Sequence, residues 1–134
     1  MQSEELVVLE PRALQYRNKM VDRRTMRRMI EVTVAAAFNL PVEELAAKTR
    51  RTAPVAFARQ ISMYCAHVTF GWSLTEAGAL FSRDRTTAAH ACRVVEDRRD
   101  DAVIDNLVQT VEDVLGFWLN SMETCRTVAP KGVE

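Results

Sequence analysis

Apolar side chains recur at steps of three and four residues along most of the chain, and no stretch shows the apolar–polar alternation of a surface strand. This period predicts helices, because residues three and four apart lie on the same face of a helix. We expect about six, at residues 12–38 with an interruption near 22–25, 41–47, 54–69, 73–81, 84–99 and 100–125. The pattern therefore predicts an all-α protein.

Local signals mark where several of these helices begin and end. Ser73 and Glu76 form a capping box, in which the serine hydroxyl and the glutamate carboxylate each accept from a backbone N–H of the other residue. Gly71 is expected to stop the preceding helix. A tight turn at 82–84 follows, and Asp84 or a neighbour is expected to cap the next helix.

Composition narrows the class of protein. The chain has 134 residues, of which 48% are hydrophobic, so one domain with a real core is expected. No apolar run reaches the length of a membrane span, and the first residues lack the pattern of a signal peptide. The three cysteines lie far apart and do not form a disulfide framework. We expect a reduced, cytoplasmic protein.

The formal net charge of zero hides an uneven distribution. Residues 12–99 carry sixteen basic and eight acidic side chains, a balance of +8, whereas residues 1–11 and 100–134 are both acidic. A basic middle between acidic ends favours a polyanionic partner. Ordinary solvated helix faces would give the same counts, so charge alone leaves both interpretations open.

Residues 73–99 have the organisation of a helix-turn-helix: a short capped helix, a tight turn and a second helix with polar and cationic groups in its first turn. In this motif the N-terminal end of the second helix enters the major groove of DNA. Arg85 could hold guanine, Asp84 could accept from cytosine, and Thr86 or Thr87 could contact thymine. An ordinary capped helix with a salt-bridged start is the alternative.

Several stretches resemble a known family closely. They are Val42-Glu43-Glu44-Leu45, Arg50-Arg51-Thr52, Ala58-Arg59-Gln60-Ile61-Ser62-Met63-Tyr64, Ser73-Leu74-Thr75-Glu76-Ala77-Gly78-Ala79-Leu80-Phe81, Arg83-Asp84-Arg85-Thr86-Thr87 and His90-Ala91-Cys92-Arg93. With them, residues 27 to about 100 resemble the C-terminal DNA-binding domain of the bacterial replication initiator DnaA. The resemblance implies a helix-turn-helix of the Trp repressor-like type, with extended terminal helices in this chain.

The resemblance, together with the location of the basic side chains, indicates which residues contact DNA. Arg51 is expected to enter the minor groove, where a narrow groove attracts arginine. The residues expected to read bases are Arg51, Asp84, Arg85, Thr86 and Thr87. The residues expected to contact the sugar–phosphate backbone are Lys48, Arg50, Thr52, Arg59, Arg83, His90 and Arg93.

The chain departs from the family pattern at several positions. They are Ala53, Phe57 and Val94, where the family often has a basic residue, Arg85, where it usually has histidine, and Ala88 and Ala89, where it has bulkier apolar groups. The turn before Arg83 is also one residue shorter than in many members. Fewer phosphate contacts weaken sequence-independent affinity. We therefore expect a target other than the family's usual box, with Arg85 shifting preference toward guanine.

Four segments are expected: a partly helical, basic N-terminal extension at 1–26, the DNA-binding domain at 27–100, a long amphipathic helix at 101–126 and a flexible tail at 127–134. No glycine has P-loop spacing, so the resemblance is to a stand-alone DNA-reading domain without the initiator's ATPase. We expect a nucleoid-associated regulator of transcription or replication that binds double-stranded DNA, with no nucleotide, cofactor or membrane partner.

The last helix leaves two interpretations open. Its apolar stripe could pack onto its own domain, or form a homodimer face. The residues of that face would be Leu107, Val111, Leu115, Trp118 and Met122. A degenerate domain copy that serves as a protein–protein adaptor through its terminal helices is the alternative function.

Catalysis and metal binding have little support in the sequence. The pairs Cys65/His67 and His90/Cys92 lie two residues apart on predicted helices, where their side chains point in different directions and cannot easily hold one ion. No constellation for nucleophilic catalysis stands out, and no acidic cluster supports a nuclease or transposase fragment. We expect a protein that is not an enzyme.

Overall fold

The computed structural model describes residues 22–47 and 52–128 of the chain, with side chains described as far as Met122. Within these ranges the protein is all-helical, which confirms the predicted class. The helices are α2 (Arg23–Phe38), α3 (Val42–Ala46), α4 (Ala53–Val68), α5 (Leu74–Leu80), α6 (Arg85–Arg98) and α7 (Ala102–Val128). No helix in this part of the chain is long and apolar enough to cross a membrane.

Capping residues set the helix boundaries. Asp22 Oδ1 accepts from the Thr25 N–H at 2.8 Å and caps the start of α2, within the region 22–25 where an interruption is predicted. Residues 12–21, predicted to be helical, lie outside the described residues. Asn39 ends α2 in the left-handed conformation, with φ 55°. Asp101 accepts from the Val103 N–H at 2.8 Å, so α7 begins at Ala102, slightly later than predicted.

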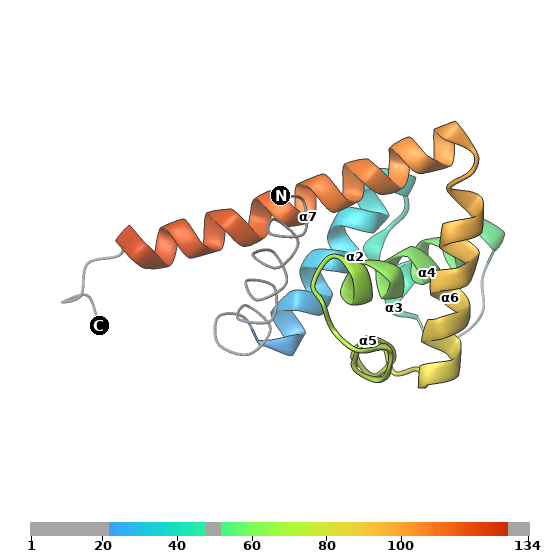
Figure 1. The fold of residues 1–134 in the computed structure, drawn as a ribbon, viewed down its shortest axis with the longest axis horizontal. Helices are drawn as coiled ribbons and strands as arrows, with labels where there is room; N and C mark the ends of the chain where they lie inside the picture. Colours follow the sequence, from blue (N-terminus) through green and yellow to red (C-terminus); the bar gives the residue numbers. More distant parts are fainter. Residues whose placement is uncertain (1–21, 48–51, 129–134) are drawn as a thin grey trace, which may run out of the picture.

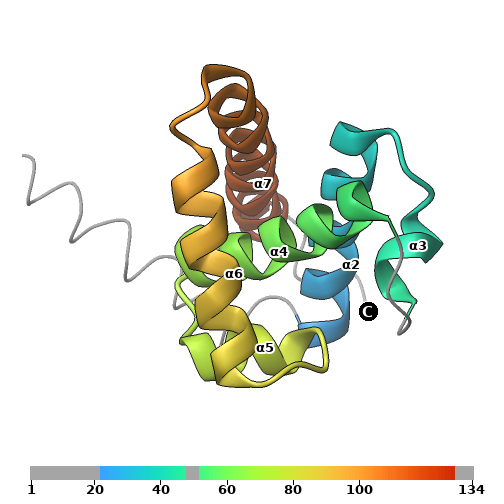
Figure 2. The same cartoon turned by 90° about the vertical axis from the view of Figure 1, so that its right-hand side faces the viewer.

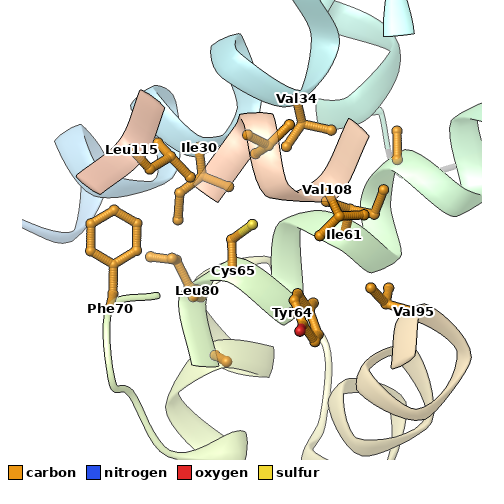
Figure 3. Packing of buried hydrophobic residues seen from close by; sticks show 14 of the residues in the cluster. Ile30, Val34, Ile61, Tyr64, Cys65, Phe70, Leu80, Val95, Val108 and Leu115 are labelled. Carbon is orange, nitrogen blue, oxygen red and sulfur yellow. The ribbon is translucent and has the colours of Figure 1, made fainter. Parts of the chain in front are cut away.

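The main core lies between α2, α4 and α7. Figure 3 shows Ile30 and Val34 of α2 facing Val108 and Leu115 of α7, with Ile61 of α4 beside them. All five side chains are fully buried. Each buried aliphatic side chain of this size contributes about 1.5–3 kcal/mol. The apolar stripes predicted for these helices therefore face one another.

A polar cluster fixes α7 to the rest of the fold. The Arg99 guanidinium, in the connection from α6 to α7, donates to Asp105 Oδ1 at 2.6 Å and to Glu112 Oε1 at 3.0 Å. It also donates to the Tyr64 hydroxyl of α4 at 3.1 Å and to Gln109 Oε1 at 3.1 Å. One side chain thus ties the first three turns of α7 to α4.

The helices place the two ends of α6 on opposite sides of the molecule. Figure 1 shows α7 along the upper side, with α5 and the first turn of α6 along the lower side. Figure 2 shows α6 crossing α4 near one end, with α3 beyond the opposite end of α4. The N-terminal tip of α6 is therefore held away from α7 and is not covered by it.

Candidate nucleic-acid interface

Helices α5 and α6 and the turn between them form the helix-turn-helix that the sequence predicts. Ser73 Oγ accepts from the Glu76 N–H, and Glu76 Oε1 accepts from the Ser73 N–H, both at 3.1 Å, which confirms the capping box. Asp84 Oδ1 accepts from the Thr87 N–H at 2.8 Å and caps α6. These short-range bonds fix the start of each helix.

The turn depends on two residues that the sequence analysis did not single out. A Cβ on Gly78 would lie 2.6 Å from the Asp84 carbonyl oxygen, so only glycine allows α5 to approach the start of α6 this closely. Ser82 has φ 61°, in the left-handed region that a non-glycine residue rarely adopts. The Arg83 N–H then donates to the Gly78 carbonyl at 2.8 Å and closes the turn.

The tip of α6 presents its polar side chains to solvent. Asp84, Arg85 and Thr86 are exposed, and Thr87 is half-buried. The hydrogen bond from the Thr87 backbone holds the pKa of Asp84 below its ordinary value, so this carboxylate is charged at neutral pH. The capping bond uses Oδ1 and leaves Oδ2 as an acceptor. A cation, a carboxylate and a hydroxyl therefore project together from one helix end.

Small side chains allow α6 to lie close to α4. Ala88 and Ala91 are buried against Met63 of α4, and these three residues form a small core of their own. Close packing on a rigid neighbour fixes the direction in which the α6 tip points. The alanine at position 88, a departure from the family pattern, is therefore a packing residue and not a surface change.

The expected backbone-contacting residues divide into three groups. On and before α6, His90 and Arg93 are exposed and Arg83 is half-buried. Thr52 is exposed at the N-cap of α4. Lys48 and Arg50 lie outside the described residues, as does Arg51, which is expected to read bases in the minor groove. Their expected DNA contacts remain predictions.

Arg59 already has protein partners. Its guanidinium donates to the carbonyl oxygens of Ala47 at 2.6 Å, Glu44 at 2.9 Å and Leu45 at 3.3 Å. These are the last carbonyls of α3, which a helix of this length leaves without backbone donors. Arg59 therefore holds the end of α3, immediately before the basic loop, against α4.

A depression of about 120 Å³ lies between the end of α3 and the turn before α6. Arg27 of α2, Arg59 of α4 and Arg83 of the turn are among its lining residues. The carboxylate at its wall is Glu31, which is buried and accepts from Arg27 Nε at 3.0 Å. Three guanidinium groups against one carboxylate make this depression positive, as a polyanion requires.

Arg27 also supports the turn itself. Its Nη1 donates to the Leu80 carbonyl oxygen at 3.2 Å, and its guanidinium lies 5.6 Å from the centre of the Phe81 ring. Sequence reasoning missed this contact because Arg27 and Leu80 are 53 residues apart. The N-terminal half of α2 therefore lies beside the turn that carries Arg83 and Asp84.

Two of the family departures have a packing reason. Phe57, where the family often has arginine, is buried and packs against Phe38 with their ring centroids 6.0 Å apart. The Arg98 guanidinium lies 4.2 Å from the centre of the Phe57 ring. Val94 is half-buried against the main core. Both positions contribute to the core instead of offering a cation to DNA.

The residues named as a possible dimer face on α7 take part in the chain's own core to different degrees. Val111 and Leu115 are fully buried in the chain's own core, and Leu107 is half-buried. Trp118 and Met122 are half-buried and pack against the same core, with Trp118 edge-on to Phe70. The structure therefore bears out the interpretation in which α7 packs on its own domain. Val111 and Leu115 are inaccessible to a second copy, and homodimerisation stays a prediction.

The cysteine and histidine pairs have structural surroundings. Cys65 and Cys92 are buried, and His67 Nδ1 lies 2.6 Å from the Trp72 carbonyl oxygen. No group of three or more potential metal ligands occurs among the described residues. In both pairs the cysteine is buried in the fold, and His67 of the first pair contacts a backbone carbonyl.

Comparison with known proteins agrees with this geometry. Residues 28–95, which include α5, the turn and most of α6, match the family model described as the bacterial DnaA protein helix-turn-helix. Relatives include proteins of Burkholderia multivorans, Burkholderia cenocepacia and Burkholderia vietnamiensis, each named chromosomal replication initiator protein DnaA. Each is 40% identical over 88 residues, which is 64% of this chain and 17% of the relative. By the match over half of its length, the chain belongs to the bacterial DnaA helix-turn-helix family.

Proposed function

We propose that this protein binds double-stranded DNA in a sequence-specific manner. The observation that carries the proposal is the exposed tip of α6, where Asp84, Arg85 and Thr86 project from one capped helix end. A helix-turn-helix reads the major groove with this end of its second helix. Membership of the DnaA helix-turn-helix family supports DNA binding on independent grounds.

Each side chain at the tip suits a different base edge. Arg85 can donate two hydrogen bonds to guanine, Asp84 can accept from cytosine, and Thr86 can contact thymine or a nearby phosphate. Thr87 is half-buried, and its backbone N–H is engaged by Asp84, so its hydroxyl has less freedom than that of Thr86. Arg85 is therefore the strongest candidate for discrimination between sequences.

A second contact in the minor groove completes the proposal. The basic loop that carries Arg51 follows Ala47 and ends at Thr52. Ala47, the last described residue before this loop, lines the same positive depression as Arg83. One duplex could then meet the α6 tip in its major groove and Arg51 in the adjacent minor groove. A regulatory role in transcription or replication fits such a binder, since the relatives are named replication initiators.

Fluorescence anisotropy with genomic duplexes tests this function. We expect a preferred site whose affinity falls steeply with salt, because phosphate contacts release counterions. Arg85→Ala should cost about 1–3 kcal/mol on the preferred duplex and relax its preference, whereas Arg93→Ala should weaken all sequences alike. Equal losses for both variants on preferred and random duplexes would show that Arg85 does not read bases.

A second candidate function is that of a protein adaptor. It is favoured by the outward face of α7, where Val103 is 76% and Phe117 is 74% exposed and Val114, three residues before Phe117, is exposed as well. Absence of duplex binding at low salt, together with a protein partner that Phe117→Asp no longer binds, would support this function over the first. Duplex binding by Phe117→Asp at wild-type affinity would favour DNA recognition.

A further inference from the structure

Four arginines lie along the first two turns of α2, and the packing of the described residues accounts for two of them. The Arg23 guanidinium lies 5.1 Å from the centre of the Trp72 ring. Arg27 binds Glu31 and the Leu80 carbonyl. Arg24 and Arg28, by contrast, are both exposed. The packing of α2 in this part of the chain therefore explains Arg23 and Arg27 but gives no reason for Arg24 and Arg28.

Helix geometry places the exposed pair beside the positive depression. Arg27 and Glu31 line the depression, and Arg24 and Arg28 each precede one of them by three residues. Residues three apart are neighbours on a helix surface, and Arg24 and Arg28 are themselves neighbours at a spacing of four. The two exposed arginines therefore lie together on the solvent side of the depression.

The acidic groups described on α2 and at its cap already have partners, and the charge of Arg24 is among the causes that lower the pKa of the Asp22 carboxylate. Glu31 is buried at 4% exposure and accepts from Arg27, and Asp22 caps the start of α2. Like charges four residues apart repel one another, so an anion that lies against the pair stabilises this part of α2. An anion with two negative groups a few ångströms apart, as successive phosphates have, therefore matches the guanidinium groups of Arg24 and Arg28.

We propose that Arg24 and Arg28 bind backbone phosphates of the same duplex that α6 reads, outside the segment contacted by the α6 tip. This inference rests on the proposed function. Figure 1 shows the start of α2, α5 and the start of α6 along one side of the molecule. Arg27 joins this part of α2 to the turn before α6, and continuity with Arg83 favours DNA over an acidic protein.

The bound DNA is therefore longer than the two grooves require. The α2 pair supplies sequence-independent affinity, which offsets the absence of a basic side chain at Phe57 and at Val94. Because the pair touches no base, it changes the affinity for all sequences equally.

The test is the salt dependence of duplex binding by Arg24→Gln/Arg28→Gln. Two phosphate contacts contribute about 1.8 to the slope of log K against log salt, which corresponds to an about twelvefold change between 50 and 200 mM salt. We expect the slope of the double variant to fall by that amount while the ratio of preferred to random affinity stays at the wild-type value. Arg24→Lys/Arg28→Lys should keep most of the slope because the charge remains.

Arg98→Gln is the matched control for single-charge loss, since Arg98 lies at the opposite end of α6. Arg28→Gln should reduce the slope by about 0.9, whereas Arg98→Gln should leave it unchanged. Equal slopes for these two variants, or a wild-type slope in the double variant, would overturn the inference. Either result would favour an acidic protein surface as the partner of Arg24 and Arg28. Absence of duplex binding by the wild type would instead refute the proposed function itself.

A hydroxyl-radical footprint gives the position of the contact. The wild type should protect sugars on one flank of the preferred site, and the double variant should no longer protect that flank while protecting the rest of the site. Protection limited to the two grooves in the wild type would contradict the inference.

Discussion

At the scale of single residues, the geometry of the α6 tip depends on backbone positions more than on charged side chains. Gly78 admits the carbonyl oxygens of Arg83 and Asp84 into space that a Cβ would fill. Ser82 adopts the left-handed backbone conformation, with φ 61°, in the short turn between α5 and α6. The orientation of Asp84 and Arg85 is therefore set by residues that touch no DNA in the proposed complex.

Gly78→Ala should damage both stability and duplex binding. The new Cβ would lie 2.6 Å from the Asp84 carbonyl oxygen, so α5 and the α6 tip must move apart. Overpacking of this kind costs about 1–3 kcal/mol. Urea unfolding should show this loss, and anisotropy should show a larger loss of affinity than Arg93→Ala gives. Gly116→Ala on α7, where an added Cβ has open space, is the control and should retain wild-type binding.

Asp84 should make the stability of the protein dependent on pH. Its pKa is lowered in the folded protein by the Thr87 N–H, so the charged form stabilises the fold. This contribution is present above the ordinary aspartate pKa and is lost as the pH falls through the folded value. Asp84→Asn keeps a capping oxygen but removes the charge. We expect the variant to be less stable than the wild type at pH 7 and nearly equal near pH 2, as measured by urea unfolding.

At the scale of elements, α7 is an integral part of the domain and not an appended arm. Its buried stripe completes the core against α2, and Arg99 joins it to α4 through Tyr64. Residues 101–126, expected to form a segment of their own, therefore share a core with residues 27–100 as far as the described side chains extend. Helix α6, whose tip is the candidate DNA-contacting end, and α7, which closes the core, are linked through Arg99.

Arg99→Met should loosen the attachment of α7. The substitution removes hydrogen bonds to Asp105, Glu112 and Tyr64 and leaves the Glu112 carboxylate largely covered without its cation. Loss of hydrogen bonds to a charged group costs about 1.5–3 kcal/mol. Tyr64→Phe, which removes one of these bonds, should cost about 1 kcal/mol in the same urea measurement. Equal stability of Arg99→Met and the wild type would show that the cluster does not hold α7.

At the scale of the whole molecule, the charged side chains are unevenly distributed over the surface. Cations gather at the α6 tip, the depression and the start of α2, whereas on the opposite side, along α7 (Figure 1), the cation Arg99 is paired with Asp105 and Glu112. We expect a molecule with this charge distribution to approach a polyanion with the side that carries the α6 tip and the start of α2. The zero net charge therefore says little about the partner.

The buried thiols should report on unfolding of the whole core. Burial raises the pKa of Cys65 to about 12 and that of Cys92 to about 11, so both are protonated and covered at neutral pH. We expect both to resist alkylation in the native protein at pH 8 and to react within minutes in denaturant, as followed by mass spectrometry. Rapid native labelling of Cys65 would contradict the packing of α4 against α7.

Much of the fold could be predicted from local patterns. The helical period, the Ser73–Glu76 capping box and the Asp84 cap depend on contacts within about one helical turn, and all three are confirmed. The resemblance pointed to the same helix-turn-helix, and the family match confirms it. The sequence shows that residues 78 and 88 are small. The reason why small residues are needed there depends on the residues that pack against them in the fold.

Contacts between distant segments could not be predicted in the same way. Within the described residues, sequence alone determined the helices to within a few positions, the caps at Ser73 and Asp84 and the helix end that carries the polar tip, because each depends on near neighbours in the chain. Only the tertiary structure decided that Val111 and Leu115 are core, that Arg59 holds the end of α3, and that Arg27 reaches Leu80. Those outcomes depend on how the helices pack against one another, and the periodicity of a single helix carries no information about its partner.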